Sequence, residues 1–158
     1  MNVLAAAPPI SAPLPDRFAR WFATRGWRPH VHQLEMLDAA ARSDSCLLIA
    51  PTGGGKTLAG FLPSLVDLER GATGAIHTLY ISPLKALTTD IARNLEAPVH
   101  EMALDVRTET RTGDTPQNRR ERQRKSPPDL LLTTPESLAL LISYPDAGRM
   151  FQGLRTVI

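Results

Sequence analysis

The sequence predicts an α/β fold in which a parallel sheet is covered by helices on both faces. From residue 46 onward, short apolar runs alternate with stretches of helical character, and such alternation builds parallel βαβ units. The runs are continuously apolar, as expected for strands buried on both faces. With 158 residues, of which 42% are apolar and 22% charged, the chain has the size and composition of about one globular domain.

The apolar periodicity places the elements in a definite order. Helical character extends over residues 16–41, with an interruption at 26–30. The expected strands are 46–50, 75–81, 104–108, 129–133 and 154–158. The expected helices after the first strand are 56–68, 83–95, 116–124 and 135–143.

The two ends of the chain are expected to differ from its middle. Residues 1–15 contain four prolines and are expected to be a disordered leader, and residues 16–158 are expected to be one partial domain. The last apolar run has no turn signal after it, so we expect a domain truncated at its C-terminal end.

Three strand-to-helix junctions place a hydroxyl residue before a proline. They are Ser82-Pro83, Thr115-Pro116 and Thr134-Pro135. This pattern is typical of an N-cap followed by proline at the first helical position. These junctions follow strands, at the edge where open α/β sheets bind ligands. Capping alone is the alternative explanation for any one of them.

Composition excludes several classes of protein. The single cysteine, Cys46, cannot form an internal disulfide or a cysteine-built zinc site, and the four histidines have no ligand spacing. The proline-rich start does not resemble a signal peptide, and no apolar run reaches about 18 residues, so we expect no membrane span and a cytoplasmic location. A net charge of +2 does not by itself indicate nucleic-acid binding.

Residues 50–57, Ala-Pro-Thr-Gly-Gly-Gly-Lys-Thr, are expected to bind nucleotide phosphates. The expected ligands are the loop residues Thr52, Gly53, Gly54 and Gly55, then Lys56 on the β- and γ-phosphates and the Thr57 hydroxyl on Mg²⁺. Lys56 and Thr57 are also the expected catalytic residues, with ATP and Mg²⁺ as cofactors. The strict motif has glycine where this chain has Ala50, and the alanine form is typical of superfamily 2 helicases. A glycine-rich turn without a ligand is the alternative.

An adenine-reading segment is expected upstream of this loop. Residues 26–33, Gly-Trp-Arg-Pro-His-Val-His-Gln, resemble the Q-motif region of superfamily 2. A glutamine amide accepts from the adenine N6 amine and donates to N7, so Gln33 is the candidate, with Trp27 or Arg28 covering the base. The alternative is an exposed helix glutamine beside a core tryptophan.

Three further segments resemble nucleic-acid-binding motifs of the same superfamily. Residues 80–87 resemble motif Ia, residues 111–115 resemble the next backbone contact, and residues 133–138 resemble motif Ib. The candidate contacts are Ser82, Pro83, Lys85, Arg111, Thr112, Gly113, Thr134, Pro135, Glu136 and Ser137. A helix N-terminus with a nearby lysine suits a phosphate. Each motif alone is weak, and their common order strengthens the set.

The stretch from Arg107 to Lys125 is strongly basic. It holds seven basic residues, which are Arg107, Arg111, Arg119, Arg120, Arg122, Arg124 and Lys125. Grooves that track a nucleic-acid backbone are basic, so this stretch is a candidate DNA contact. A solvated helix face is the alternative for residues 119–125.

Together these motifs resemble superfamily 2 DEAD/DEAH-box helicases, within them the large helicase-related family, and more narrowly the ligase-associated DEXH-box DNA helicases. The resemblance covers residues 16–158 and implies a RecA-like P-loop domain of an ATP-dependent DNA helicase. It further implies 3′-to-5′ movement on single-stranded DNA, a role in DNA repair, and an RNA–DNA hybrid as the alternative substrate. A DNA ligase or nuclease partner is suggested only by the family name.

Two parts that such motors need are not expected in this chain. The Asp-Glu-x-His motif would follow the strand begun at residue 154, and a second RecA-like domain supplies arginine fingers. We therefore expect these 158 residues to have no useful ATPase or helicase activity alone.

Two other classes of function stay open at this point. A phosphate-loop nucleotide kinase predicts that nucleotide affinity does not respond to DNA. A non-catalytic DNA- or protein-binding module predicts no Mg²⁺-dependent ATP binding. The serine- and threonine-proline junctions favour a long polyanion over a kinase substrate.

Overall fold

The computed structural model describes residues 13–71 and 74–158, so most of the expected leader at 1–15 lies outside the described residues. The chain divides into two compact units, Met1–Pro63 and Ser64–Ile158. The helices are α1 (Asp16–Thr24), α2 (Val31–Ala41), α3 (Lys56–Leu68), α4 (Lys85–Glu101), α5 (Gln117–Lys125), α6 (Pro135–Ile142) and α7 (Ala147–Phe151). The strands are β1 (Thr78–Ile81), β2 (Thr108–Arg111), β3 (Leu130–Thr133) and β4 (Thr156–Val157).

The second unit contains a four-stranded sheet with the order β2-β3-β1-β4. All three strand pairs are parallel, with Leu79 opposite Leu131 in the β1–β3 pair. All four residues of β3 are buried, as expected of a central strand in a sheet covered on both faces. The predicted parallel α/β fold is therefore confirmed.

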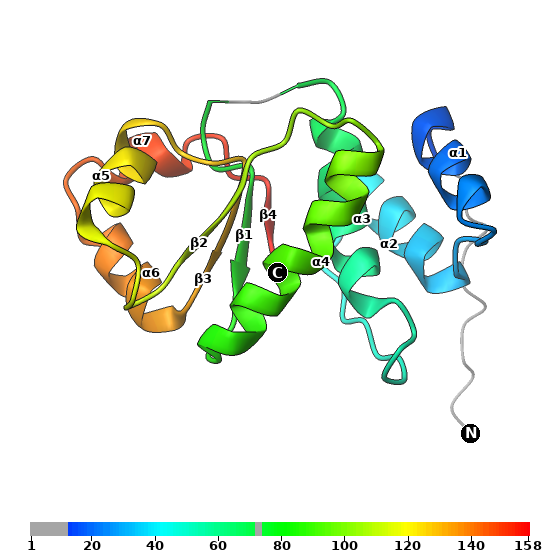
Figure 1. The fold of residues 1–158 in the computed structure, drawn as a ribbon, viewed down its shortest axis with the longest axis horizontal. Coiled ribbons are helices and arrows are strands. Elements are labelled where there is room, and N and C mark those ends of the chain that lie inside the picture. Colours follow the sequence, from blue (N-terminus) through cyan, green and yellow to red (C-terminus); the bar gives the residue numbers. More distant parts are fainter. Residues whose placement is uncertain (1–12, 72–73) are drawn as a thin grey trace. The chain divides into compact units, whose positions relative to one another are not determined.

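Helices cover both faces of this sheet. Within the second unit, α4 lies on one side of the strands, whereas α5, α6 and α7 lie on the other (Figure 1). On the α6 and α7 side, Ile76, Leu79, Leu131, Leu141 and Met150 form one buried cluster. On the opposite side, α4 contacts β2 and β3. Burying each such side chain contributes roughly 1.5–3 kcal/mol, so these two layers hold the sheet in place.

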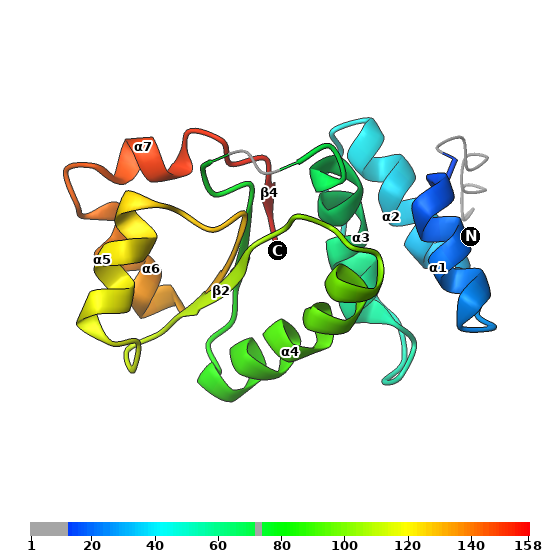
Figure 2. The ribbon, with the colours of Figure 1, turned by 45° about the horizontal axis from the view of Figure 1, so that its top comes forward.

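The edge strands of the sheet are β2 on one side and β4 on the other. Figure 2 shows β2 leading toward α5.

Across both described ranges, no helix combines the length and apolar character that crossing a membrane requires.

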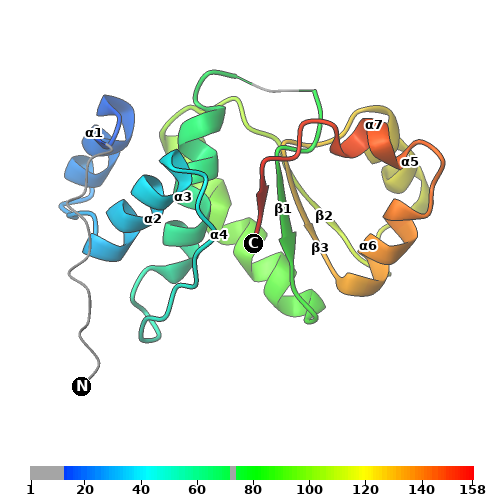
Figure 3. The same ribbon diagram turned by 180° about the vertical axis from the view of Figure 1, so that it is seen from behind.

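In the first unit, α1 is followed by α2 (Figure 3). A turn at Gly26 separates the two helices. The Gly26 N–H donates to Ala23 O and the Trp27 N–H donates to Phe22 O, both at 2.9 Å. These two bonds form a Schellman ending, which needs a left-handed residue, and Gly26 has φ +65°. The predicted break in helical character at 26–30 is therefore confirmed, with glycine as its cause.

The prediction of a strand at 46–50 is wrong. Those residues are not part of any strand in the described ranges, and Leu47 and Ile49 are each 85% exposed. An apolar run becomes a strand only when a neighbouring backbone takes up its hydrogen bonds, and no described strand does so here.

Other boundaries also differ from expectation. The third strand was expected at 104–108 but lies at Thr108–Arg111, an edge strand whose Glu109 binds a side chain of α5. Helix α4 runs on to Glu101, and α7 was not expected. The hydroxyl-proline capping rule holds only at α6, where Thr134 accepts from the Ser137 N–H at 3.4 Å. The N-cap of α4 is Leu84 and that of α5 is Pro116.

Glu109 on β2 anchors α5 through a buried carboxylate. Its Oε2 accepts from Arg119 at 3.2 Å and from Arg122 and Gln123 at 2.9 Å each. Burial acts to raise the pKa of Glu109, but the hydrogen bonds from Gln123, Arg122 and Arg119 together hold it below its ordinary value. Part of the basic stretch is thus engaged in attaching α5 to the sheet.

We expect Glu109→Gln to lower the free energy of unfolding by about 1–3 kcal/mol at neutral pH, because two guanidinium groups lose a charged acceptor. A carboxyl whose pKa is lowered by folding stabilises the protein above its unfolded pKa, and that contribution is lost as pH falls through the folded pKa. Urea unfolding at pH 7 and at a pH below the ordinary carboxyl pKa of 4.5 should show the variant's deficit shrinking in the more acidic solution. Glu121→Gln, an exposed change on the same helix, is the control and should be near neutral.

Candidate nucleotide and nucleic-acid sites

The phosphate-loop residues form a tight turn that leads into α3. Gly53 and Gly55 have φ values of +81° and +70°, which side chains rarely adopt. The Lys56 ammonium donates to Ala50 O at 2.8 Å and to Pro51 O at 2.7 Å. A single cation therefore sits against the loop backbone at the N-terminus of a helix, which is the electrostatic setting that favours an anion.

Gln33 lies against this loop and is 2% exposed. Its Oε1 accepts from the His30 N–H at 2.9 Å, and its Nε2 donates to Gly55 O at 3.4 Å. Gln33 stays the predicted adenine clamp, and both ends of its amide have protein partners in this structure. Reading adenine would require these two bonds to be exchanged for bonds to the base.

Trp27 and Arg28 are both exposed, and Trp27 has half of its surface open. The Trp27 ring lies edge-on to Trp21 at 5.9 Å, and the Arg25 guanidinium lies 4.7 Å from the Trp27 ring centroid. The ring of Trp27 thus already makes a cation–π contact with Arg25. The contact between Arg25 and Trp27 was not predicted. The position of Arg25 two residues before Trp27 could have suggested it.

The metal prediction rests on one hydroxyl. Thr57, the second residue of α3, is half-buried and stays the predicted Mg²⁺ ligand, while Thr52 is exposed. In the described ranges, no three His, Cys, Asp or Glu side chains gather in a way that could hold a metal ion. Mg²⁺ commonly keeps several waters and uses few protein ligands together with phosphate oxygens, so this donor set fits a nucleotide-bound ion.

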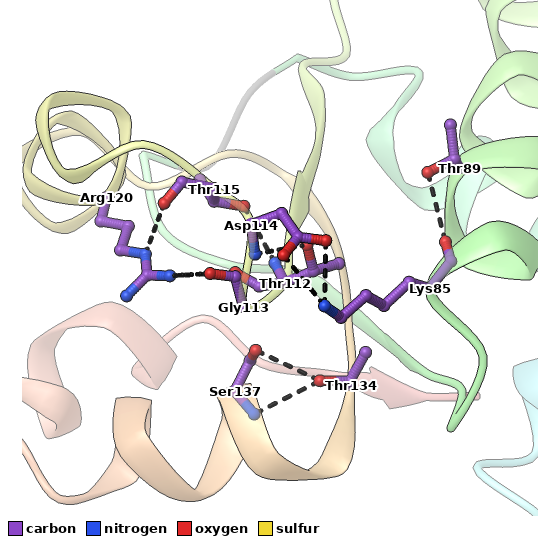
Figure 4. A network of polar contacts seen from close by, with 9 residues as sticks. All are labelled: Lys85, Thr89, Thr112, Gly113, Asp114, Thr115, Arg120, Thr134 and Ser137. Carbon is purple, nitrogen blue, oxygen red and sulfur yellow. Dashed lines mark hydrogen bonds and ion pairs between the residues drawn. The ribbon is translucent and has the colours of Figure 1, made fainter.

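In the second unit, the three predicted nucleic-acid segments meet at the carboxyl ends of β1, β2 and β3 (Figure 4). The Ser82 N–H donates to Thr133 O at 3.0 Å, and Thr133 Oγ1 donates to Arg111 O at 2.7 Å. Thr134 Oγ1 and Ser137 Oγ are 3.2 Å apart in the first turn of α6. Pro135 and Glu136 of the same turn are exposed. The three strand ends are therefore tied to one another by hydrogen bonds.

Lys85 extends across this edge to the segment that follows β2. Its Nζ lies 3.0 and 2.9 Å from the two carboxylate oxygens of Asp114. Both side chains are exposed, Lys85 at 54% and Asp114 at 77%. An exposed pair of this kind contributes roughly 0–1 kcal/mol, so a phosphate oxygen competes with Asp114 for Lys85 at little cost.

Arg111, a predicted nucleic-acid contact, has its side chain buried against α5. It is 3% exposed, its Nη1 donates to Arg120 O at 3.2 Å, and its guanidinium lies 5.9 Å from the Tyr144 ring centroid. The side chain points from β2 toward α5 because alternate residues of a strand face opposite sides of the sheet. Thr112 and Gly113, which follow it, lie at the sheet edge instead (Figure 4).

Most of the basic stretch has internal partners. Arg124 pairs with Asp146 at 2.8 Å and stacks on Tyr144 at 4.3 Å, and Arg107 donates to Ser126 O at 2.8 Å. Arg119 and Arg122 share Glu109. Neither predicted alternative, a DNA groove or a solvated helix face, included this structural role. Most of these arginines hold α5 and its flanking loops in place.

The sequence resembles that of known helicases over most of its length. Residues 30–158 match the family described as DEAD/DEAH box helicase. The "Lhr helicase/uracil glycosylase" of Escherichia coli K12 is 41% identical over 98% of this chain and 12% of its own length. The "ATP-dependent helicase Lhr-Core" of Methanocaldococcus jannaschii is 39% identical over 71% of this chain and 15% of its own length.

A solved structure gives the same result in three dimensions. The Mycobacterium smegmatis helicase Lhr bound to ssDNA and AMP-PNP superposes with a TM-score of 0.83 and 36% identity. That match covers 91% of this chain and 20% of the solved chain. The chain described here thus spans only a small part of each of these three relatives.

Proposed function

The chain belongs to the DEAD/DEAH box helicase family, and from that premise we propose that it is the ATP-binding and single-stranded-DNA-binding portion of an Lhr-like, ATP-dependent helicase. The observation that carries the proposal is the phosphate loop, in which Lys56 lies against a glycine turn at the start of α3. The resemblance to ligase-associated helicases supplies the finer parts of the proposal, namely 3′-to-5′ movement on DNA, a repair role, a cytoplasmic location and a ligase or nuclease partner.

For nucleotide binding, the proposed exchange of partners is simple. The phosphate oxygens of ATP would replace Ala50 O and Pro51 O as acceptors for the Lys56 ammonium. Loop N–H groups and the N-terminus of α3 would add neutral donors. When bound, Mg²⁺ would neutralise phosphate charge next to the Thr57 hydroxyl. Gln33, already in contact with Gly55 O, would link occupancy of the loop to recognition of the base.

For nucleic-acid binding, the proposed surface is the strand-end edge that holds Lys85, Gly113 and the first turn of α6 (Figure 4). The N-terminus of α6 offers N–H donors and Lys85 offers the charge, whereas Thr134 and Ser137 are buried and hydrogen-bonded to each other, so they shape this turn. This composition suits the phosphate backbone and carries no base-specific contact. The similar M. smegmatis helicase Lhr was solved bound to ssDNA and AMP-PNP, which supports single-stranded DNA over an RNA–DNA hybrid.

A titration of the 158-residue chain with a fluorescent ATP analogue tests the proposal. We expect Mg²⁺-dependent binding whose affinity changes when single-stranded DNA is added. Binding that ignores DNA would favour a nucleotide kinase, and absence of Mg²⁺-dependent binding would favour a non-catalytic module. Either result contradicts the proposed function.

We expect no useful ATP hydrolysis by these 158 residues alone. The sequence contains no Asp-Glu-x-His to orient water, and arginine fingers from a partner domain contribute roughly 10³–10⁵ in rate in comparable enzymes. Phosphate release measured with and without single-stranded DNA should therefore stay near background. DNA-stimulated release that Lys56→Ala abolishes would overturn this expectation.

Lys85→Ala and Asp114→Asn are expected to change DNA affinity in opposite directions. Removing the ammonium deletes one phosphate contact and should reduce the single-strand salt slope by about 0.7. Removing the competing carboxylate should tighten binding by a few-fold, on the order of the 0–1 kcal/mol of an exposed pair. Asp105→Asn, an exposed carboxylate before β2, matches the charge change and should have a smaller effect. Equal tightening by both asparagine variants would show that only net charge matters.

A further inference from the structure

Arg120 of α5 binds the backbone of the loop that connects β2 to α5. Its Nε donates to Thr115 O at 2.7 Å, and its Nη2 donates to Gly113 O at 2.6 Å and to Thr112 O at 3.3 Å (Figure 4). One half-buried guanidinium therefore engages three carbonyls of a four-residue segment, Thr112–Thr115. We call this segment the 112–115 loop.

These bonds set the direction of the loop's amides. A trans peptide points its C=O and the following N–H in opposite directions. Because Thr112 O points toward Arg120, the Gly113 N–H points away from it. Within the loop, the Thr112 N–H donates to Thr115 Oγ1 at 2.9 Å, the Asp114 N–H to Thr112 Oγ1 at 3.3 Å and the Thr115 N–H to Thr112 O at 3.1 Å. Among the described residues, the Gly113 N–H donates no hydrogen bond, unlike the other three N–H groups of the loop.

Gly113 also lies beside the charged group of the proposed DNA surface. A Cβ built on Gly113 would be 3.5 Å from Lys85 Nζ and 3.8 Å from Lys85 Cε. A neutral backbone donor and a flexible ammonium thus lie next to each other. A phosphate oxygen placed near Lys85 is within reach of this amide as well, provided that the loop keeps its orientation.

We propose that Arg120 is a positioning residue for single-stranded DNA: it holds the 112–115 loop so that the Gly113 N–H and Lys85 receive the same phosphate. This inference rests on the DNA-binding part of the proposed function. Arg120 acts through the loop and does not itself touch DNA, because its Nε and Nη2 donate to loop carbonyls. The planar fork of arginine suits several acceptors at fixed angles, and lysine presents only a point charge.

The test compares Arg120→Ala, Arg120→Lys and Arg122→Ala in the 158-residue chain, with fluorescence anisotropy of a labelled oligothymidylate at several salt concentrations. Both Arg120 variants should bind about 3–10-fold more weakly, the effect of one net hydrogen bond. Their salt slope should equal that of the wild type. A neutral amide displaces no counterions when it binds a phosphate, so losing that contact does not change the salt dependence. Arg122→Ala removes the same charge from the same helix but leaves the loop bonds in place, so its affinity should fall less.

Three results would overturn the inference while leaving the proposed function intact. They are unchanged affinity in both Arg120 variants, wild-type affinity in Arg120→Lys, and a slope reduced by about 0.7, which would mean direct phosphate contact. If Arg120→Ala does not fold, judged by thermal unfolding, the lysine variant carries the test. Absence of oligothymidylate binding by the wild type would instead contradict the proposed function, and the inference with it.

Discussion

Lys56→Ala is expected to abolish measurable binding of ATP analogues. The ammonium lies on the loop backbone, where it donates to two carbonyls. A charge-assisted hydrogen bond contributes roughly 1.5–3 kcal/mol, so losing contacts to two phosphates weakens binding by roughly 10²–10⁴-fold. No other single change in the chain is expected to lower nucleotide affinity as much.

The same substitution should leave the fold nearly unchanged. Lys56 is exposed at the first position of α3, so alanine, a strong helix former, is tolerated there. Lys125→Ala is the matched control, because it removes an equal charge from an exposed helix end. Isothermal titration with an ATP analogue and Mg²⁺, together with thermal unfolding, separates the two effects. Retained binding in Lys56→Ala, or equal loss in Lys125→Ala, would contradict the assignment of the loop.

Local signals predicted much of the fold because several elements are fixed by their own residues. Helix α3 begins at Lys56 and ends at Leu68 as expected, since the glycine turn precedes it and Gly71 follows it. The central strand β3 was recognised because an uninterrupted apolar run suits a strand buried on both faces. The same reasoning gave a strand at 46–50, which the structure does not contain. Strand formation depends on a neighbouring backbone, and a single segment does not specify that neighbour.

The candidate sites were also predictable where local sequence specifies them and not where distant segments do. Motif spacing identified the loop at 50–57 and the segments that meet at the sheet edge, because each motif is contiguous in sequence. Side-chain direction was not predictable in the same way. Arg111 was predicted as a nucleic-acid contact, and its side chain is buried. The partners of Lys85 and Arg120 come from segments up to 29 positions away. Charge counting alone could not separate arginines that hold the fold from those open to a ligand.

Gly55→Ala is expected to damage the nucleotide site in a different way from loss of Lys56. A Cβ on Gly55 would lie 2.8 Å from Gln33 Nε2 and 3.4 Å from His30 Cδ2. The residue also has φ +70°, and the left-handed conformation costs an L-residue roughly 1–2 kcal/mol. The substitution therefore strains the loop and displaces the buried amide that is predicted to read adenine.

The expected result is a loss of at least about 10-fold in affinity for ATP analogues, from 1–2 kcal/mol of strain and from the displaced glutamine. Discrimination between adenine and guanine nucleotides should weaken in the same variant. Gln33→Ala combined with Gly55→Ala should recover part of the affinity for the phosphates, because it removes the clash and leaves only the backbone strain. It should not recover base discrimination, because the amide is gone.

Gly148→Ala provides the control for adding a methyl group. A Cβ on Gly148 meets nothing within 4 Å, and its φ is not positive, so binding and stability should match the wild type. Parallel titrations with fluorescent ATP and GTP analogues separate the two causes in Gly55→Ala. If that variant binds both nucleotides as the wild type does, the loop does not need its left-handed turn. If the double variant regains base discrimination, Gln33 does not read adenine, and another residue recognises the base.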